Sequence, residues 1–146
     1  MRAPNFWRVR SGISAILAPL GHTYALAGTA HRRFTTPWRA PVAVICVGNL
    51  VAGGAGKTPI AIAIGAILQD KGKEVHFLSR GYGGILTGPV RVDPDVHTAK
   101  QVGDEPLLLG RVAPTWIAKN KVAGAKAALS NGAEIIVMDD GFQNPS

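Results

Sequence analysis

A run of apolar residues leads directly into a glycine-rich turn, and this junction constrains the fold more than any other part of the sequence. Residues 42–47 are all apolar, three glycines follow within residues 53–56, and the turn ends in Lys57-Thr58. A helical pattern covers residues 59–71 and begins with a proline, which the first turn of a helix tolerates. A continuous apolar strand is typical of a parallel sheet that is covered on both faces.

Strands and helices alternate along the rest of the sequence. We expect further strands at 75–79, 90–92, 115–118 and 135–139, and helices at 104–111 and 122–130. This alternation predicts an α/β fold of the P-loop NTPase type: a three-layer, mostly parallel sheet with its ligand at the carboxyl ends of the strands. The one cysteine, Cys46, excludes an internal disulfide, and its apolar neighbours predict a place in the core.

The positive charge is confined to the first forty residues. The formal net charge is +7, and residues 1–40 hold six arginines but no Asp or Glu. The remaining residues are nearly balanced, which argues against a nucleic-acid-binding body. Two prolines, Pro37 and Pro41, close this basic part. We therefore expect a leading helical segment and linker over residues 1–40 and a nucleotide-binding domain over residues 41–146.

The leading segment carries twenty residues, 11–30, without a formal charge. That length suits a transmembrane helix, but glycine, proline and polar residues interrupt it. The aromatic residues Phe6 and Trp7 among arginines favour amphipathic helices that lie in the membrane interface. Two alternatives remain: a signal peptide, because residues 25–27 imitate a cleavage site, and a helix that packs on the protein core.

The glycine-rich turn has the context of a phosphate-binding loop, because it joins a strand to a helix. Its backbone N–H groups are expected to surround the phosphates of ATP, Lys57 to reach the β- and γ-phosphates, and Thr58 to bind Mg²⁺. The generic pattern has glycine where this chain has Val51. The alternative is a glycine-rich turn with a surface lysine. The predicted nucleotide-binding residues are Val51, Ala52, Gly53, Gly54, Ala55, Gly56, Lys57 and Thr58.

Two adjacent carboxylates, Asp139 and Asp140, end the apolar strand at 135–139. A carboxylate in this position commonly binds Mg²⁺ in nucleotide-binding proteins. We assign Asp139 to the metal and Asp140 to the active site. The alternative is an aspartate that caps a turn.

A third acidic site follows Gly103. Asp104 precedes Glu105 and Pro106 at the start of a predicted helix. Its carboxylate could accept the proton of an attacking hydroxyl, or it could cap the helix. Arg80 could neutralise phosphate charge, or it could be an ordinary surface arginine.

Taken in order, these segments resemble the tetraacyldisaccharide 4'-kinase family, also called lipid A 4'-kinases. The resemblance implies transfer of the ATP γ-phosphate to the 4'-hydroxyl of a tetraacylated glucosamine disaccharide 1-phosphate. The segments that carry it are Val47-Gly48-Asn49, Gly53-Gly54-Ala55-Gly56-Lys57-Thr58-Pro59, Leu78-Ser79-Arg80-Gly81-Tyr82-Gly83-Gly84, Gly103-Asp104-Glu105-Pro106 and Asp139-Asp140-Gly141-Phe142-Gln143.

The resemblance also implies site residues and a location. The family's catalytic aspartate falls on Asp104, its phosphate loop on residues 51–58, and its Mg²⁺-linked aspartates on Asp139 and Asp140. The expected partners are the acylated disaccharide lipid and the membrane surface, at the cytoplasmic face of the bacterial inner membrane, with peripheral or monotopic attachment. No obligate protein partner is inferred.

Family members are about twice this length, and the histidine that pairs with the catalytic aspartate falls beyond Ser146. We therefore expect the chain to be a fragment. Two alternatives to a lipid kinase remain. One is a GTP-using P-loop protein, although Asn120-Lys121 only begins the guanine-binding motif. The other is a non-enzymatic, membrane-attached nucleotide-binding module.

Overall fold

The computed structural model describes residues 38–48 and 56–139. The predicted leading segment, residues 1–40, lies almost wholly outside this range, so its interfacial helices and its boundary stay predictions. No helix within the described residues is long and apolar enough to cross a bilayer. The elements are β1 (Ala43–Val47), α2 (Lys57–Asp70), β2 (Val75–Ser79), β3 (Val90–Val92), α3 (Ala99–Val102), α4 (Asp104–Gly110), β4 (Thr115–Ile117), α5 (Lys121–Ser130) and β5 (Ile135–Asp139).

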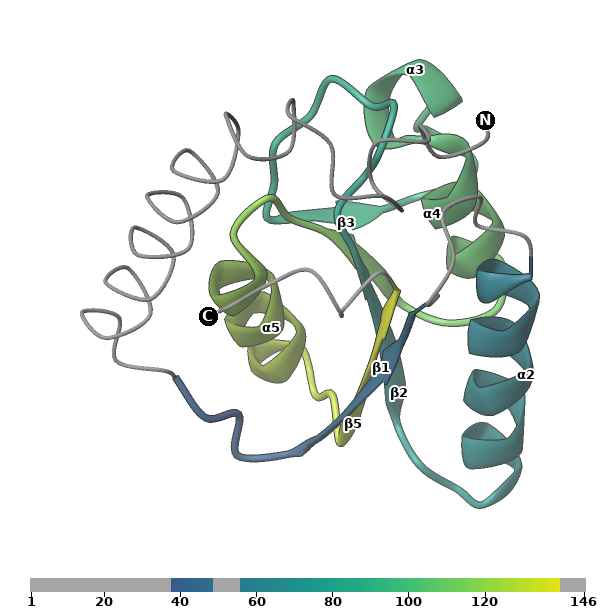
Figure 1. Ribbon diagram of the computed structural model, residues 1–146, viewed down its shortest axis with the longest axis vertical. Helices are drawn as coiled ribbons and strands as arrows, with labels where there is room; N and C mark the ends of the chain where they lie inside the picture. Colours follow the sequence, from purple (N-terminus) through teal and green to yellow (C-terminus); the bar gives the residue numbers. More distant parts are fainter. Residues whose placement is uncertain (1–37, 49–55, 140–146) are drawn as a thin grey trace, which may run out of the picture. The chain divides into compact units, whose positions relative to one another are not determined.

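The five strands form one sheet in the order β1-β5-β2-β4-β3 (Figure 1). The pairs β1 with β5, β5 with β2, and β2 with β4 are parallel, whereas β3 runs antiparallel to β4. The predicted mostly parallel sheet is confirmed. Because the four parallel strands point the same way, their carboxyl ends meet at one edge of the sheet.

Helices cover both faces of this sheet (Figure 1). On one face, α2 and α4 contribute Ala61 and Leu109 to a core with Phe77 of β2. On the other face, α5 contributes Ala125 and Ala128 to a second core. The predicted three-layer arrangement is therefore present, with β2 buried along its whole length.

Glycines in two helices allow close packing against β2 from both sides. A Cβ atom added to Gly65 of α2 would lie 2.5 Å from Cζ of Phe77. A Cβ atom added to Gly124 of α5 would lie 2.5 Å from Cδ1 of Leu78. Real Cβ atoms do not approach other heavy atoms so closely, so any side chain here would push its helix away from the sheet or displace its neighbour.

The predicted element boundaries hold to within two residues. The strands at 75–79, 90–92 and 135–139 match the structure, while α2 begins at Lys57, two residues earlier than expected. The short helix α3 was not predicted. Its start carries a capping box in which the Gln101 side chain accepts a hydrogen bond from the Thr98 backbone N–H at 2.9 Å.

The prediction that Cys46 lies in the core is wrong. Cys46 is exposed, and Val44 in the same strand is 37% exposed. The reason is the strand order, because among the strands that the structure describes β1 pairs with one neighbour, β5. An apolar sequence predicts what a strand can bury but not its position in the sheet.

A buried histidine lies on the α5 face of the sheet. His76 in β2 is 2% exposed, and its Nδ1 accepts a hydrogen bond from Nε1 of Trp116 at 3.2 Å. Burial lowers the pKa of His76, partly offset by the nearby Glu74 carboxylate, and Arg91 lowers it further. The neutral imidazole is thus the form that fits the fold, because a protonated Nδ1 could not accept the indole N–H.

We expect the protein to lose stability in mild acid through His76. Its folded pKa lies below its ordinary value of 6.5, so below about pH 6.5 the unfolded chain binds the proton more readily. The unfolding free energy should then fall with pH, by at most about 1.4 kcal/mol per pH unit for one proton. Urea titrations between pH 8 and pH 5 measure the slope. His76→Gln should flatten it, and an unchanged slope in this variant would contradict the assignment.

Candidate functional site

The predicted phosphate loop is described only at its end. Residues 51–55 lie outside the described residues, whereas Gly56 is the N-cap of α2 with φ 94° and Lys57 and Thr58 are its first two residues. Thr58 is buried at 7% exposure. The first turn of α2 contains no acidic residue, so none of its own side chains offsets the positive end of the helix dipole. This helix start can accept an anion.

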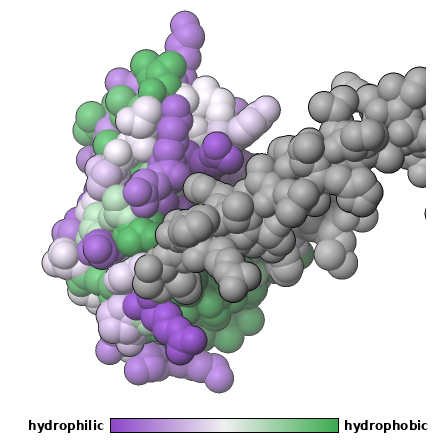
Figure 2. All heavy atoms as spheres, turned by 60° about the vertical axis from the view of Figure 1, so that its left-hand side comes forward, coloured by the Kyte–Doolittle hydropathy of each residue, from purple (hydrophilic) through white to green (hydrophobic). Residues whose placement is uncertain are grey.

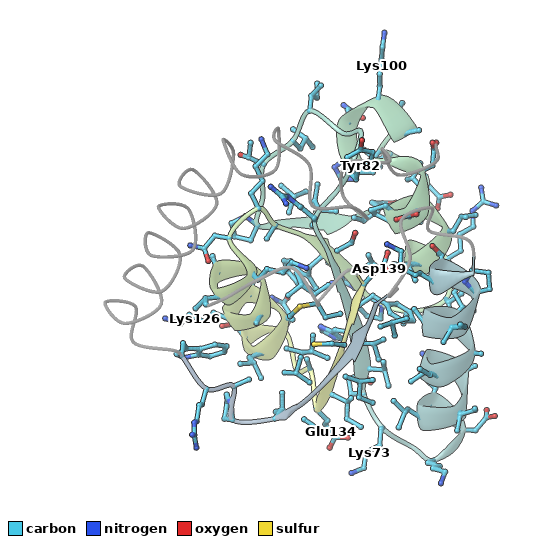
Figure 3. All side chains as sticks on the ribbon, viewed as in Figure 1. Lys73, Tyr82, Lys100, Lys126, Glu134 and Asp139 are labelled. Atoms are coloured by element: carbon cyan, nitrogen blue, oxygen red, sulfur yellow. The ribbon has the colours of Figure 1, made fainter. Side chains whose placement is uncertain are left out.

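Asp139 lies beside the end of β1 because of strand pairing. It ends β5 and pairs in register with Val47, the last residue of β1 before the loop. Figure 3 shows Asp139 at the carboxyl end of β5, away from Lys73 and Glu134, which lie at the opposite end of this strand. The end of the loop strand and the predicted metal ligand therefore adjoin on neighbouring strands. Asp140 lies outside the described residues.

The Asp139 carboxylate fits a cation. Asp139 is 1% exposed, and its Oδ1 is buried without a hydrogen-bond partner. Leaving a buried carboxylate oxygen unpaired costs free energy, and binding a cation would remove that cost. Within the described residues there is no group of three or more His, Cys, Asp or Glu side chains that could hold a metal.

Lys121 contacts this site, although sequence analysis gave it no role there. It is the first residue of α5 and is only 8% exposed, and its Nζ donates a hydrogen bond to the backbone carbonyl of Asp139 at 3.3 Å. The preceding Asn120 caps α5 by accepting the Ala123 N–H at 3.1 Å. Both residues of the incomplete guanine motif thus have other partners. The sequence signal that could have identified Lys121 is its position at the start of the helix that follows β4.

Asp104 reaches the same edge of the sheet from α4. The capping interpretation is not supported, because the N-cap of α4 is Gly103 and no side chain makes a cap hydrogen bond there. Asp104 is instead the first residue of α4, and its side chain is exposed. Arg80 follows β2 and is also exposed. Arg80 therefore follows a strand that is next to β5, whereas α4, which carries Asp104, contacts β2 and β4.

Two glycines allow the start of α4 to pack closely against the segment that follows β2. A Cβ atom on Gly103 would lie 2.5 Å from the Tyr82 carbonyl oxygen, and one on Gly84 would lie 2.7 Å from the Gln101 carbonyl oxygen. A hydrogen bond from the Leu86 N–H to the Gln101 carbonyl oxygen, at 2.9 Å, joins the same two segments. The position of Asp104 therefore depends on residues that have no side chain.

We expect Gly103→Ala to destabilise the fold by about 2–4 kcal/mol, because the new Cβ meets a backbone carbonyl and the residue has φ +93°. Gly132 has a similar φ of +91° but nothing within 4 Å of an added Cβ. Gly132→Ala should therefore cost only the backbone strain, about 1–2 kcal/mol. Thermal and urea unfolding measure both. Equal losses in the two variants would show that the close contact at Gly103 is unimportant.

A hollow of about 590 Å³ lies at the other end of the sheet. Its lining includes Val92, Pro114 and two arginines, Arg91 and Arg111. Pro114 precedes β4, so this hollow adjoins the amino ends of the parallel strands. None of the predicted site residues lines it. The nucleotide is expected at the opposite edge, where Lys57, Thr58 and Asp139 lie.

Comparisons with known proteins identify a family that this chain matches. Residues 13–146 match the family described as tetraacyldisaccharide-1-P 4'-kinase. Among curated relatives, the tetraacyldisaccharide 4'-kinase of Parvibaculum lavamentivorans is 57% identical over 99% of this chain and 44% of its own length. The protein of the same name from Jannaschia sp. is 55% identical over 100% of this chain and 45% of its own length.

A solved structure is also similar. It is LpxK from Aquifex aeolicus, described as an "apo" form in complex with ATP, with a TM-score of 0.70 and 30% identity. The match covers 90% of this chain and 45% of that one. This chain thus spans less than half the length of the curated relatives that it matches. From the match over residues 13–146 and these identities, the chain belongs to the tetraacyldisaccharide-1-P 4'-kinase family.

Proposed function

We propose that this chain is the nucleotide-binding part of an ATP-dependent kinase. The enzyme would transfer the γ-phosphate to the 4'-hydroxyl of a tetraacyldisaccharide 1-phosphate, a step of lipid A biosynthesis. The observation that carries the proposal is the register of β1 and β5, in which Val47 before the loop pairs with Asp139. Family membership and the ATP named with the Aquifex aeolicus structure support the choice of phosphate donor.

Phosphate binding is assigned to the P-loop. The backbone N–H groups of residues 51–58 would surround the phosphates at the positive end of α2. Lys57 would contact the β- and γ-phosphates, and its charge would stabilise the negative charge of the transition state. Thr58 and Asp139 would hold Mg²⁺, and Asp140 would support them in the active site. When bound, the ion neutralises phosphate charge.

Asp104 is assigned as the general base. Its carboxylate would take the proton from the 4'-hydroxyl as that oxygen bonds to the γ-phosphorus. The bond between the γ-phosphorus and the bridging oxygen would break, and ADP would leave with the electron pair. Arg80, which follows the adjacent strand β2, would offset charge on the transferred phosphoryl group.

A chimera tests this function. In it, the chain replaces the matched region of the Parvibaculum lavamentivorans relative, which restores the length of a family member. We expect the chimera to transfer ³²P from γ-labelled ATP to a tetraacyldisaccharide 1-phosphate, and to prefer ATP over GTP. A chimera that binds ATP but labels no lipid would indicate a non-enzymatic module. A preference for GTP over ATP would instead favour a GTP-using P-loop protein.

We further propose that the leading segment attaches the protein to the cytoplasmic face of the inner membrane, as a peripheral or monotopic protein. The support is its six arginines without an acidic residue, each of which could contribute about 1 kcal/mol near an anionic surface. Substrate access also favours this location, because an acylated disaccharide resides in a membrane.

We expect deletion of residues 1–37 to abolish salt-sensitive binding to vesicles that contain phosphatidylglycerol. The deletion stops before Trp38, because Trp38 packs against the α5 core and lies 5.7 Å from Nζ of Lys126. A variant with glutamine for Arg2, Arg8, Arg10, Arg32 and Arg33 keeps the length and should also lose binding at low salt. Vesicle flotation measures both, and unchanged recovery after deletion would contradict membrane attachment through this segment.

A further inference from the structure

The hollow at the amino ends of the strands, here called the amino-edge hollow, has the size of a small-molecule site. Its volume is about 590 Å³, within the range of roughly 300–1,000 Å³ that is common for ligand pockets. Two segments line it: residues 91–94, which include the end of β3, and residues 110–114, which join α4 to β4. Neither segment carries a residue to which a role in phosphoryl transfer is assigned. The amino-edge hollow is therefore a candidate for a second binding site.

Two arginines dominate the charge of the amino-edge hollow. Arg91 and Arg111 line it, one from each segment, and among the described residues of the lining Asp93 is the acidic one. Both arginines are exposed, and within residues 38–48 and 56–139 neither guanidinium makes an ion pair or a hydrogen bond. The Asp93 carboxylate, in contrast, already accepts the Asp95 N–H through Oδ1 at 3.0 Å. A ligand would thus meet two guanidiniums with open donors and one partly engaged carboxylate.

Exposed charges alone would not mark a site on this surface. Figure 2 shows hydrophilic side chains spread from the top to the bottom of one face, among apolar ones. Arg91 and Arg111 differ from such scattered residues because two chain segments bring them to one concave surface. Guanidinium groups bind phosphate and carboxylate oxygens through pairs of hydrogen bonds. Two guanidiniums in one hollow therefore favour an oxyanion as the ligand.

The end of α4 adds little negative charge to the amino-edge hollow. The last carbonyl oxygens of a helix carry partial negative charge, which would oppose an anion. Here the Leu108 carbonyl oxygen accepts the Arg111 N–H at 3.4 Å, and the Leu109 carbonyl oxygen accepts those of Val112 at 2.9 Å and Ala113 at 3.2 Å. These bonds also occupy the backbone donors of the loop, so the recognition of a ligand falls to the arginine side chains.

The rest of the lining is an apolar wall that is already packed. Its apolar side chains are those of Val92, Pro94, Val112, Ala113 and Pro114. Val92 and Ala113 are buried, and the Val112 carbonyl oxygen accepts a hydrogen bond from Nε2 of Gln69 in α2 at 3.4 Å. A Cβ atom on Gly110 would lie 3.1 Å from Cγ of Pro94, so the two segments are in contact. The wall is thus formed without a ligand, as in most small-molecule sites.

We infer that the amino-edge hollow binds a small organic oxyanion, in which a phosphate or carboxylate group contacts Arg91 and Arg111 and an apolar body contacts the wall. Charge-assisted hydrogen bonds would orient the oxyanion, and burial of the apolar body would add affinity. The site would be separate from the nucleotide, which is expected at the carboxyl ends of the strands. The inference therefore does not depend on the kinase function proposed above.

Phenyl phosphate is a suitable probe, because it joins an oxyanion to an aromatic ring. In a ¹H–¹⁵N titration of the chain, we expect it to shift the amides of Val92, Arg111 and Val112 with a Kd below about 1 mM. Benzylamine has a similar ring but the opposite charge, and it should not shift these amides. Equal shifts with the two probes, or no shift up to about 10 mM phenyl phosphate, would overturn the inference.

Two further probes define the ligand. Inorganic phosphate lacks the apolar body and should bind at least about tenfold more weakly than phenyl phosphate. Equal affinities would show that the wall is not contacted and would contradict the inference. Phenylacetate carries a carboxylate instead of a phosphate. Tighter binding of phenylacetate would identify a carboxylate ligand, and tighter binding of phenyl phosphate would identify a phosphate ester.

Substitutions locate the bound probe. Arg91→Gln and Arg111→Gln should each weaken phenyl phosphate binding by at least about tenfold, because each removes a charge-assisted contact. Lys100→Gln removes the same charge from an exposed residue outside the lining, at the top of Figure 3, and should leave the affinity unchanged. Equal affinities in all three variants would overturn the inference. Lys57→Ala should also leave the affinity unchanged, whereas lost binding would place the probe at the phosphate loop and overturn the inference.

Asp93→Asn tests the sign of the charge by a gain of affinity. The asparagine oxygen can still accept the Asp95 N–H, so the loop should keep its conformation. Loss of a negative charge beside the oxyanion should tighten phenyl phosphate binding by about two- to fivefold, an effect that partial unfolding cannot produce. Weaker binding would contradict an oxyanion site. None of these titrations requires phosphoryl transfer, so failure of the kinase proposal and failure of this inference give different results.

Discussion

Replacing Lys57 with alanine in the chimera is expected to lower the rate of phosphoryl transfer by about 10²–10³-fold. Lys57 is the first residue of α2, directly after the N-cap Gly56, and it lies at the end of the predicted phosphate loop. Removing one preorganised group that stabilises transition-state charge typically has an effect of this size. Single-turnover transfer from labelled ATP measures the chemical step separately from product release.

Lys73→Ala is the matched control for Lys57. Lys73 is half exposed and pairs with Glu134 at 3.7 Å, at the other end of the molecule (Figure 3). Exposed ion pairs of this kind contribute little to stability, so activity should stay within about twofold of the parent. Melting temperatures of both variants should be close to that of the parent. If Lys57→Ala retained activity within about threefold, the assignment of the phosphate loop would be wrong.

Replacing Asp104 with asparagine is expected to lower kcat by roughly 10²–10⁴-fold, with little change in ATP affinity. An amide cannot take the proton of the attacking hydroxyl, whereas a carboxylate can. Stability should change little, because the N-cap of α4 is Gly103 and Asp104 makes no cap bond there. The favourable effect of an acidic residue in a first helical turn is about 0.3–1 kcal/mol. Single-turnover kinetics and a thermal melt of the same variant give the two quantities.

Asp93 offers a carboxylate with a purely local contact for comparison. Its Oδ1 accepts a hydrogen bond from the Asp95 N–H at 3.0 Å, and an asparagine oxygen can accept the same bond. Asp93→Asn should therefore leave both turnover and melting temperature close to those of the parent. Normal turnover in Asp104→Asn would remove Asp104 from the chemistry, while slow turnover in both variants would point to a nonspecific effect of lost negative charge.

Local sequence patterns were sufficient for the strands and for the helix α2 that follows the glycine-rich turn. Apolar runs at 75–79 and 135–139 match β2 and β5, because strands buried on both faces need apolar residues at every position. The same reasoning identified Asp139 at a strand end. The register that puts it beside Val47 could not be predicted, since it depends on which strands are neighbours.

The errors and omissions concern contacts between distant parts of the sequence. Cys46 was expected in the core because its neighbours are apolar, but exposure depends on strand order. Lys121 was overlooked because its partner, the Asp139 carbonyl, is distant in sequence. The helix α3 is different, because the Thr98 and Gln101 capping box was visible in the sequence and only its short length concealed it.

The pairing of β1 with β5 has a consequence for the order of events during synthesis. Ala43 pairs with Ile135, so β1 leaves the ribosome long before its partner. At typical rates of about 5–20 residues per second, the delay is on the order of ten seconds. Pairings between distant residues also close slowly. The end of β1 and the aspartate at the end of β5 thus adjoin only after β5 has emerged, and a nascent chain cannot assemble this part of the site earlier.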